Sequence, residues 1–290
     1  MQAPVRTGYE SVLGQRTSDL FCYSARQKGK VISKKDNSIL IEYEDGTQKG
    51  IQLGRRFGAA AGLTIAHSVV SDMKVGQEFN RGDIIAYNDG FFEKDILNPD
   101  NVILKNAVLA KTVLWESTQT HEDASSISRK LADKLSTKIT KVKQVVISFE
   151  QEVKDILKPG SDVEHQTILC TIEDPLTSGA GLFDESTLST LKMFSNQTPQ
   201  AKTKGVLEKI EVFYNGEKED MSDSLRALAD AGDRALASQF RSLGKRPMTG
   251  QVDEGYRIDG DPLQLDHLVI KFYLTTDESA GVGDRLGPIC

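Results

Sequence analysis

The first strong pattern along the chain is an alternation of apolar and polar residues between Gly29 and Leu53. Successive side chains of a β-strand point to opposite faces, so this period predicts strands with one buried face. Two polar stretches, KDNS at 35–38 and EDGT at 44–47, interrupt it and are typical of turns. We expect a β-meander here.

A stretch rich in small residues follows, GRRFGAAAGLTIAHS at 54–68, and it loses the alternation. Without a strand period we predict a loop or a short helix. The small side chains indicate that this segment passes close to another part of the protein.

A turn pattern then occurs more than once. Gly-x-x-Phe-x-x-Gly-Asp lies between short apolar segments in DMKVGQEFNRGDIIAYNDGFF (72–92). It returns in ILKPGSDVEHQTILCTIEDP (156–175), where Pro159-Gly160 aligns with Val75-Gly76. A partial third copy is GVGDRLG at 281–287. Glycine at such positions marks turns, so we predict the same turn, followed by an apolar strand, at 72–92 and 156–175.

The other periodic segments complete the picture. A short amphipathic helix is predicted at 126–138, with Ser126 or Ser128 as cap, and the best helix at 222–243, with Ser222 or Asp223 as cap. Strands are predicted at 139–153, in a strand pair or bent strand at 205–220, and at 265–277. The fold class is therefore mostly β with short helices (α+β).

Composition narrows the class of protein. The 290 residues are 38% hydrophobic and 27% charged, which is globular composition, and no apolar run is long enough to cross a bilayer. The net charge of -6 argues against a free-standing nucleic-acid binder, unless another subunit of an assembly supplies a basic surface. Three isolated cysteines fit a reducing cytoplasm, and with the four histidines they show no zinc-ligand spacing.

Two short motifs carry candidate chemistry. His121-Glu122-Asp123 is either an acidic turn that caps the next helix or a pair of carboxylates facing a metal-bound phosphate. Arg55-Arg56 is either surface charge or a phosphate contact, because a guanidinium grips two oxygens. We expect His67 and His267 to be structural and Cys170 to be buried.

Five stretches, in this order, resemble the second half of the β subunit of multisubunit DNA-directed RNA polymerases. They are QAPVRTGYE (2–10), VGQEFNRGDIIAYNDG (75–90), LWESTQTHEDASSISRKL (114–131), KPGSDVEHQTILCTIEDP (158–175) and HLVIKFYLTTDESAGVGDRLG (267–287). Glu122-Asp123 falls on the family's Glu-Asp pair, whereas Arg285 replaces its lysine after Gly-Asp. A β subunit divided among genes resembles the polymerases of giant bacteriophages.

The resemblance implies nucleotidyl transfer, in which the RNA 3′ hydroxyl attacks the α-phosphate of a nucleoside triphosphate held by Mg²⁺. It places the tightly bound ion on a partner β′-like subunit. It implies that Asp123, with Glu122, faces the second ion and the triphosphate. Arg285 would supply positive charge to the nucleotide or the RNA 3′ end. Arg55 and Arg56 would contact phosphates of the nucleic acid or the nucleotide.

The implied architecture is part of a double-psi β-barrel with an inserted flap-like region. Residues 1–125 would form the first part of the active-centre barrel, 126–265 the flap-like insertion, and 266–290 a returning barrel strand with a truncated turn. The partners would be other polymerase subunits, one of which continues the barrel beyond Cys290. Template DNA and RNA would be bound within the complex, and no membrane would be involved. The implied location is the cytoplasm of a bacterial host, and the chain alone would be inactive.

Two other hypotheses stay open. The Gly-Asp turn also occurs in lipoyl- and biotinyl-type carrier domains, which need a lysine at the tip of a hairpin. MK at 73–74 and LKM at 191–193 do not stand in that place. The third hypothesis is a diverged, non-catalytic barrel or sandwich-hybrid scaffold.

Overall fold

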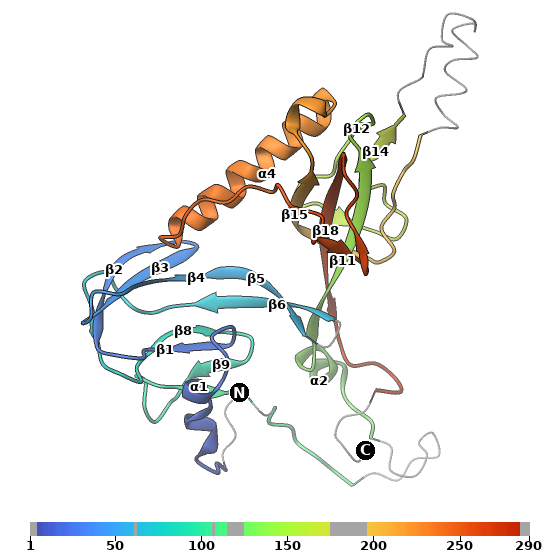
Figure 1. Cartoon of the computed structure of the whole chain (residues 1–290). Helices are drawn as coiled ribbons and strands as arrows, with labels where there is room; N and C mark the ends of the chain where they lie inside the picture. The colour runs from blue at the N-terminus through green and yellow to red at the C-terminus, as the bar shows by residue number, and fades with distance from the viewer. Residues whose placement is uncertain (1–4, 61–62, 106–107, 115–124, 175–195, 285–290) are drawn as a thin grey trace, which may run out of the picture. The chain divides into compact units, whose positions relative to one another are not determined.

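The computed structural model describes residues 5–60, 63–105, 108–114, 125–174 and 196–284 (Figure 1). The chain divides into two compact units. Unit 1 combines residues 1–139 with 277–290, and unit 2 is 140–276. The chain thus leaves unit 1 once and returns to it. Our division into functional segments at 125/126 and 265/266 stays a prediction.

Unit 1 is built from short helices and antiparallel strands. Its helical elements are η1 (Tyr9–Ser11), α1 (Leu13–Arg16) and α2 (Arg129–Lys134). Its strands are β1 (Cys22–Ser24), β2 (Gly29–Lys35), β3 (Ser38–Tyr43), β4 (Gln48–Gln52), β5 (Gly54–Ala60), β6 (Leu63–Val70), β7 (Glu78–Phe79), β8 (Ile84–Asn88), β9 (Phe92–Lys94) and β10 (Val102–Leu104). They pair in the orders β4-β3-β2-β7, β1-β8-β6-β5 and β9-β10.

Unit 2 has longer strands and one long helix. Its strands are β11 (Thr137–Ser148), which begins in the last residues of unit 1, β12 (Glu152–Lys154), β13 (Asp162–Val163), β14 (Thr171–Glu173), β15 (Gly205–Asn215), β16 (Arg257–Ile258), β17 (Asp261–Pro262) and β18 (His267–Glu278). Its helices are η3 (Lys218–Asp220) and α4 (Asp223–Ser242). The strand orders are β11-β18-β15-β13, β12-β14 and β16-β17.

The β-meander predicted for 29–53 is confirmed. β2, β3 and β4 pair in sequence, and their inward side chains, such as Ile39 and Ile41, are fully buried. In the second turn, Gly46 has φ 80° and Asp45 accepts the backbone N–H of Thr47 at 2.8 Å. Hydrophobic alternation therefore located both the strands and the buried face.

The prediction of a loop or short helix at 54–68 was wrong. These residues form the hairpin β5–β6, paired without interruption from Gly54–Val69 to Ala60–Leu63. Small side chains hid the strand period. The expected close approach is present at Gly58, because a Cβ there would lie 2.7 Å from Leu20 Cδ2.

Helix α4 packs on β15 and β12 and covers one side of the core of unit 2 (Figure 1). Its predicted position is confirmed, and Leu225 and Ala229 are buried. The glycine that interrupts its apolar face, Gly232, lies against β15, since a Cβ there would sit 3.2 Å from Val212 Cβ. Ser222 occupies the N-cap position, but its hydroxyl donates to Gln151 O at 2.7 Å instead of capping the helix.

The repeated turn has the same backbone geometry in both units. In unit 1, Gly76 donates its N–H to Val31 O at 2.8 Å. In unit 2, Gly160 donates to Leu207 O at 2.7 Å. Both glycines have left-handed φ, 80° and 93°. The short strand that follows each turn pairs antiparallel with the strand that holds the acceptor, β7 with β2 and β13 with β15. The turn of the predicted repeat is confirmed. The apolar strand expected after it is β8 in unit 1, whereas residues 167–170 in unit 2 form only an isolated bridge at Ile168.

The correspondence continues into a second bend about six residues further on. Gly82 donates its N–H to Ala25 O at 2.8 Å, and Gln166 donates to Ala201 O at 2.9 Å. Both donors have positive φ, 93° and 70°. Ala25 and Ala201 are both buried. Each copy thus has a buried alanine at its second bend, in the core of its own unit.

A side chain closes this second bend. Asp83 Oδ2 accepts the N–H of Asn80 at 2.8 Å, and Thr167 Oγ1 accepts the N–H of Glu164 at 3.0 Å. The partial third copy repeats the bond, because Asp284 Oδ2 accepts the N–H of Gly281 at 2.7 Å. The residue before Asp284, a glycine, has φ 94°. The Gly-Asp pair therefore builds the same bend at 80–83 and 281–284.

The fold is mostly β with few helices, as predicted. In the described residues the strands form open sheets, and no closed barrel is found among them. No helix in the described ranges is both long enough and apolar enough to span a membrane.

Candidate functional site

Three of the predicted site residues, Glu122, Asp123 and Arg285, lie outside the described residues. The other two, Arg55 and Arg56, lie on β5 in unit 1. Across the hairpin they face Ser68 and His67 of β6. The arginine pair therefore belongs to a paired strand rather than to a loop.

Arg56 is a partly buried cation. Burial lowers the pKa of its guanidinium, and the charge of Asp19 partly opposes that shift. Within the described part of the chain, the side chain of Arg56 makes no hydrogen bond and no ion pair. Asp19 instead lies 3.4 Å from Arg26. An arginine kept on a strand without a carboxylate partner is suited to an anion such as a phosphate.

The residue opposite Arg56, His67, is buried and hydrogen-bonded, which fits the structural role that we expected. It is 1% exposed, and its Nδ1 lies 2.6 Å from the amide nitrogen of Asn88. Since the Asn88 carbonyl oxygen accepts the N–H of Gly90, its amide nitrogen donates to His67 Nδ1. The ring also meets Phe21 edge-on at 5.1 Å.

Burial lowers the pKa of His67, and the nearby Arg56 and Arg55 lower it further. An uncharged imidazole adds no positive charge beside the arginines. It serves as a buried support for the face of the hairpin on which Arg56 lies.

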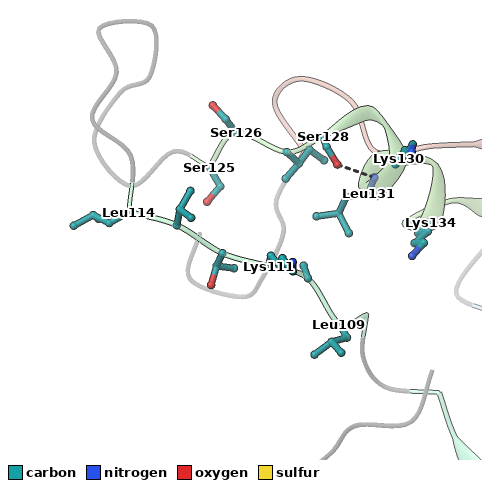
Figure 2. A pocket seen from close by; sticks show the side chains of 13 residues that line it. Leu109, Lys111, Leu114, Ser125, Ser126, Ser128, Lys130, Leu131 and Lys134 are labelled. Atoms are coloured by element: carbon teal, nitrogen blue, oxygen red, sulfur yellow. Dashed lines mark hydrogen bonds between the residues drawn. The ribbon is translucent and has the colours of Figure 1, made fainter.

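A second candidate site in unit 1 is a groove of about 700 Å³ (Figure 2). Its walls are residues 109–114 on one side and Ser125–Ser128 with α2 on the other. Ser128 caps α2, because its hydroxyl accepts the N–H of Leu131 at 3.3 Å, which confirms one of the two predicted caps. In the sequence, the lining residues come directly before and after 115–124, which lies outside the described residues.

The lining of this groove combines apolar and basic side chains. Among its described lining residues, every charged side chain is a lysine: Lys111, Lys130 and Lys134. Leu109 is 67% exposed, Val113 is 78% exposed and Leu114 is fully exposed. The sequence of residues 108–114, VLAKTVL, is largely apolar. It does not show that these side chains are exposed to solvent beside three lysines.

Two of the cysteines are described, and both are buried without a disulfide. Burial raises the pKa of the Cys22 thiol to about 12 and that of Cys170 to about 11. Neither is a reactive thiolate at neutral pH, and the expectation that Cys170 is buried is confirmed.

Metal ligands do not gather in the part of the chain that the structure describes. No three His, Cys, Asp or Glu side chains lie there in a group that could hold a metal ion. We therefore assign no magnesium ligand within those ranges. The chain matches no model of a known protein family and no curated protein.

Proposed function

We propose that this chain is one part of a split, β-like subunit of a multisubunit DNA-dependent RNA polymerase. In this proposal it contributes to the wall of the active centre around the incoming nucleotide and the RNA 3′ end. The observation that carries the proposal is the order of five polymerase-like stretches between residues 2 and 287. One such match is weak, but five in register along one chain are hard to obtain by chance.

The described geometry supports the proposal in two respects. The Gly-Asp motifs at 82–83 and 283–284 build the same bend, in which the aspartate accepts a backbone N–H from three residues earlier, so two of the five stretches share a local structure. Arg56 is a partly buried cation on a paired strand, and its side chain has no ion-pair partner within 4 Å among the described residues, which suits contact with a phosphate. The finer architecture, a double-psi β-barrel completed by a partner, is part of the proposal.

The proposed chemistry divides the work between chains. Mg²⁺, when bound, neutralises the triphosphate and the developing charge, and its tight site belongs to a partner β′-like subunit. Asp123, with Glu122, faces the triphosphate from the β side. Arg285 directs positive charge at the nucleotide or the RNA 3′ end. Arg55 and Arg56 hold phosphates of the nucleic acid or the nucleotide in position.

The carrier hypothesis is weakened by the fold. In a carrier domain, the two Gly-Asp turns belong to the two halves of one small barrel. Here the turn at 76–83 lies in unit 1, and the turn at 160–167 lies in unit 2. Each turn also pairs with a strand of its own unit.

The first test is co-purification of a tagged chain from the cells in which it is made. We expect the other polymerase polypeptides in the eluate and template-directed RNA synthesis by the complex. The chain purified alone should show none. Recovery without polymerase polypeptides, or synthesis by the isolated chain, would contradict the proposal.

The second test separates a catalytic part from a scaffold. In the reconstituted complex, Asp123→Ala should slow elongation by about tenfold or more, because it removes a charge near the reacting phosphates. Asp36→Ala, which changes an exposed aspartate in the turn at 35–38, is the matched control and should leave the rate unchanged. Equal rates for the two variants would favour the scaffold.

A further inference from the structure

Residues 108–114, VLAKTVL, form an exposed segment with the composition of a strand but without a strand's pairing. The segment has neither helix nor strand, and Figure 2 shows residues 109–114 as a nearly straight run along the groove. Within the described part of the chain, no backbone hydrogen bond reaches any of these residues. Within the described ranges, these seven consecutive residues therefore present a row of N–H and C=O groups that have no backbone partner.

Such a segment is a template for strand addition. Val108, Thr112 and Val113 are β-branched residues, which favour extended backbone. An exposed, apolar, unpaired strand readily pairs with another chain, because main-chain hydrogen bonds supply affinity and alternate side chains supply specificity. The three large exposed apolar side chains of the segment, Leu109, Val113 and Leu114, would also be removed from water on pairing.

The charge around the segment selects the chemistry of its partner. Lys111 lies within it, and Lys130 and Lys134 line the facing wall of the groove. No acidic side chain is among the described lining residues. A partner that alternates apolar and acidic side chains would satisfy both features of the groove.

Two other occupants fit less well. Single-stranded nucleic acid needs aromatic side chains on which bases stack, and the described lining contains none. A second copy of the chain, paired antiparallel about the middle of the segment, would place Lys111 opposite Lys111. Like charges directly opposite each other destabilise a strand pair.

We propose that residues 108–114 are a docking strand that pairs with an extended segment of another polypeptide, in which apolar and acidic side chains alternate. The docking strand is supported by its exposed side chains, its lack of backbone partners among the described residues, and the lysines that line the groove. It does not require the partner to be a polymerase subunit.

The test uses the full-length chain and three labelled synthetic peptides of equal length. One alternates Glu with Val, one alternates Lys with Val, and one alternates Glu with Gly. We expect fluorescence anisotropy to show that the Glu-Val peptide binds at least about tenfold more tightly than either of the others. Amide hydrogen exchange in residues 108–114 should slow when that peptide binds, which is the signature of strand pairing.

Two pairs of variants locate the binding. Thr112→Pro removes a backbone N–H from the strand and should weaken binding at least about tenfold, whereas Thr112→Ala keeps the N–H and should not. Replacing Lys111, Lys130 and Lys134 together with glutamate should weaken binding at least about tenfold. The matched control replaces the exposed Lys35, Lys74 and Lys158 with glutamate. Circular dichroism confirms that each variant is folded.

Three results would overturn the docking strand. The first is Glu-Val peptide binding that neither Thr112→Pro nor the groove lysine variant changes. The second is self-association in sedimentation that Thr112→Pro abolishes, which would make a second copy the occupant. The third is binding of oligodeoxythymidine, but of no peptide, that the groove lysine variant abolishes. The co-purification test does not depend on any of these, so the two proposals can fail separately.

Discussion

The two copies of the turn reach the same backbone geometry with different side chains. Unit 1 uses Gly82 and Asp83 where unit 2 uses Gln166 and Thr167, yet the hydrogen bonds differ by no more than 0.2 Å. In each copy, a neighbouring strand of the same unit, β2 or β15, accepts the first N–H of the turn. The partner strand, rather than the identity of each turn residue, therefore fixes this conformation.

The copies also differ in chain order. In unit 1 the partner strand β2 comes before the turn, and in unit 2 the partner strand β15 comes after it. The same set of contacts is thus built from segments connected in the opposite order. Backbone pairing depends on which segments meet, not on the order in which the chain supplies them.

The largest expected difference between the copies lies in the core. Phe79 and Val163 occupy equivalent positions, and each is 1% exposed. Phe79→Ala should lower the free energy of unfolding by about 3–5 kcal/mol, because it leaves a large cavity. Val163→Ala removes fewer buried atoms and should cost less. Urea denaturation of both variants measures this, and equal losses would show that the equivalence does not extend to packing.

A smaller loss of stability is expected at a position where both copies have a glycine. Gly29 and Gly205 are paired with Phe79 and Val163. A Cβ at Gly29 would lie 2.3 Å from Glu42 O, and one at Gly205 would lie 2.5 Å from Thr275 O. Each Gly→Ala change should therefore cost about 1–3 kcal/mol through displaced backbone.

The control for these two variants is Gly281→Ala, since a Cβ there meets nothing closer than 3.8 Å. Urea unfolding curves of the three variants give the comparison. A loss at only one of Gly29 and Gly205 would break the structural equivalence of β2 and β15.

Exchanging the residues of the second bend tests the role of backbone conformation. Gly82 and Gln166 both have positive φ, which costs a residue with a Cβ about 1–2 kcal/mol. Gly82→Gln should therefore destabilise the protein, and Gln166→Gly should stabilise it by a similar or smaller amount. Thermal melting should show a lower melting temperature for Gly82→Gln and a higher one for Gln166→Gly. Destabilisation by both would show that the Gln166 side chain makes a contribution that outweighs its strained backbone.

The smallest effect is a pH dependence expected from unit 1. Burial lowers the pKa of His67 in the folded protein, whereas in the unfolded chain it lies near its usual value of about 6.5. The unfolded state therefore binds a proton first as the pH falls. Stability should be full above about pH 6.5 and decrease as the pH falls toward the lowered pKa of folded His67.

Urea midpoints measured at a series of pH values test this. His67→Gln should flatten the loss of stability as the pH falls below about 6.5. His165→Gln changes an exposed histidine of unit 2 and should leave the profile unchanged. The same profile for wild type and His67→Gln would show that other groups cause the loss.

Several features could be predicted from the sequence because they depend on neighbours in the chain. The strands β2–β4 follow from alternation over 29–53, and α4 follows from its 3.6-residue period. The turn within 72–92 and its second copy within 156–175 were found because glycine marks the places where the backbone takes positive φ. Each of these signals is local.

The candidate site was predicted only in part. Arg55 and Arg56 were found as a pair of charges, but their place on a strand was missed, because glycine and alanine carry no β period. That Arg56 is partly buried opposite a neutral His67 depends on the pairing of β5 with β6 and on the position of Phe21. The sequence could not show those contacts.

By itself, then, the sequence determined the mostly β class, the long helix and the repeated turn. The tertiary structure decided which strand each turn pairs with, in an order opposite between the units, and which apolar run stays exposed. The docking strand at 108–114 and the buried strands have similar composition. They differ in whether another segment of the chain pairs with their backbone and shields their side chains from water. Contacts between residues distant in sequence decide this.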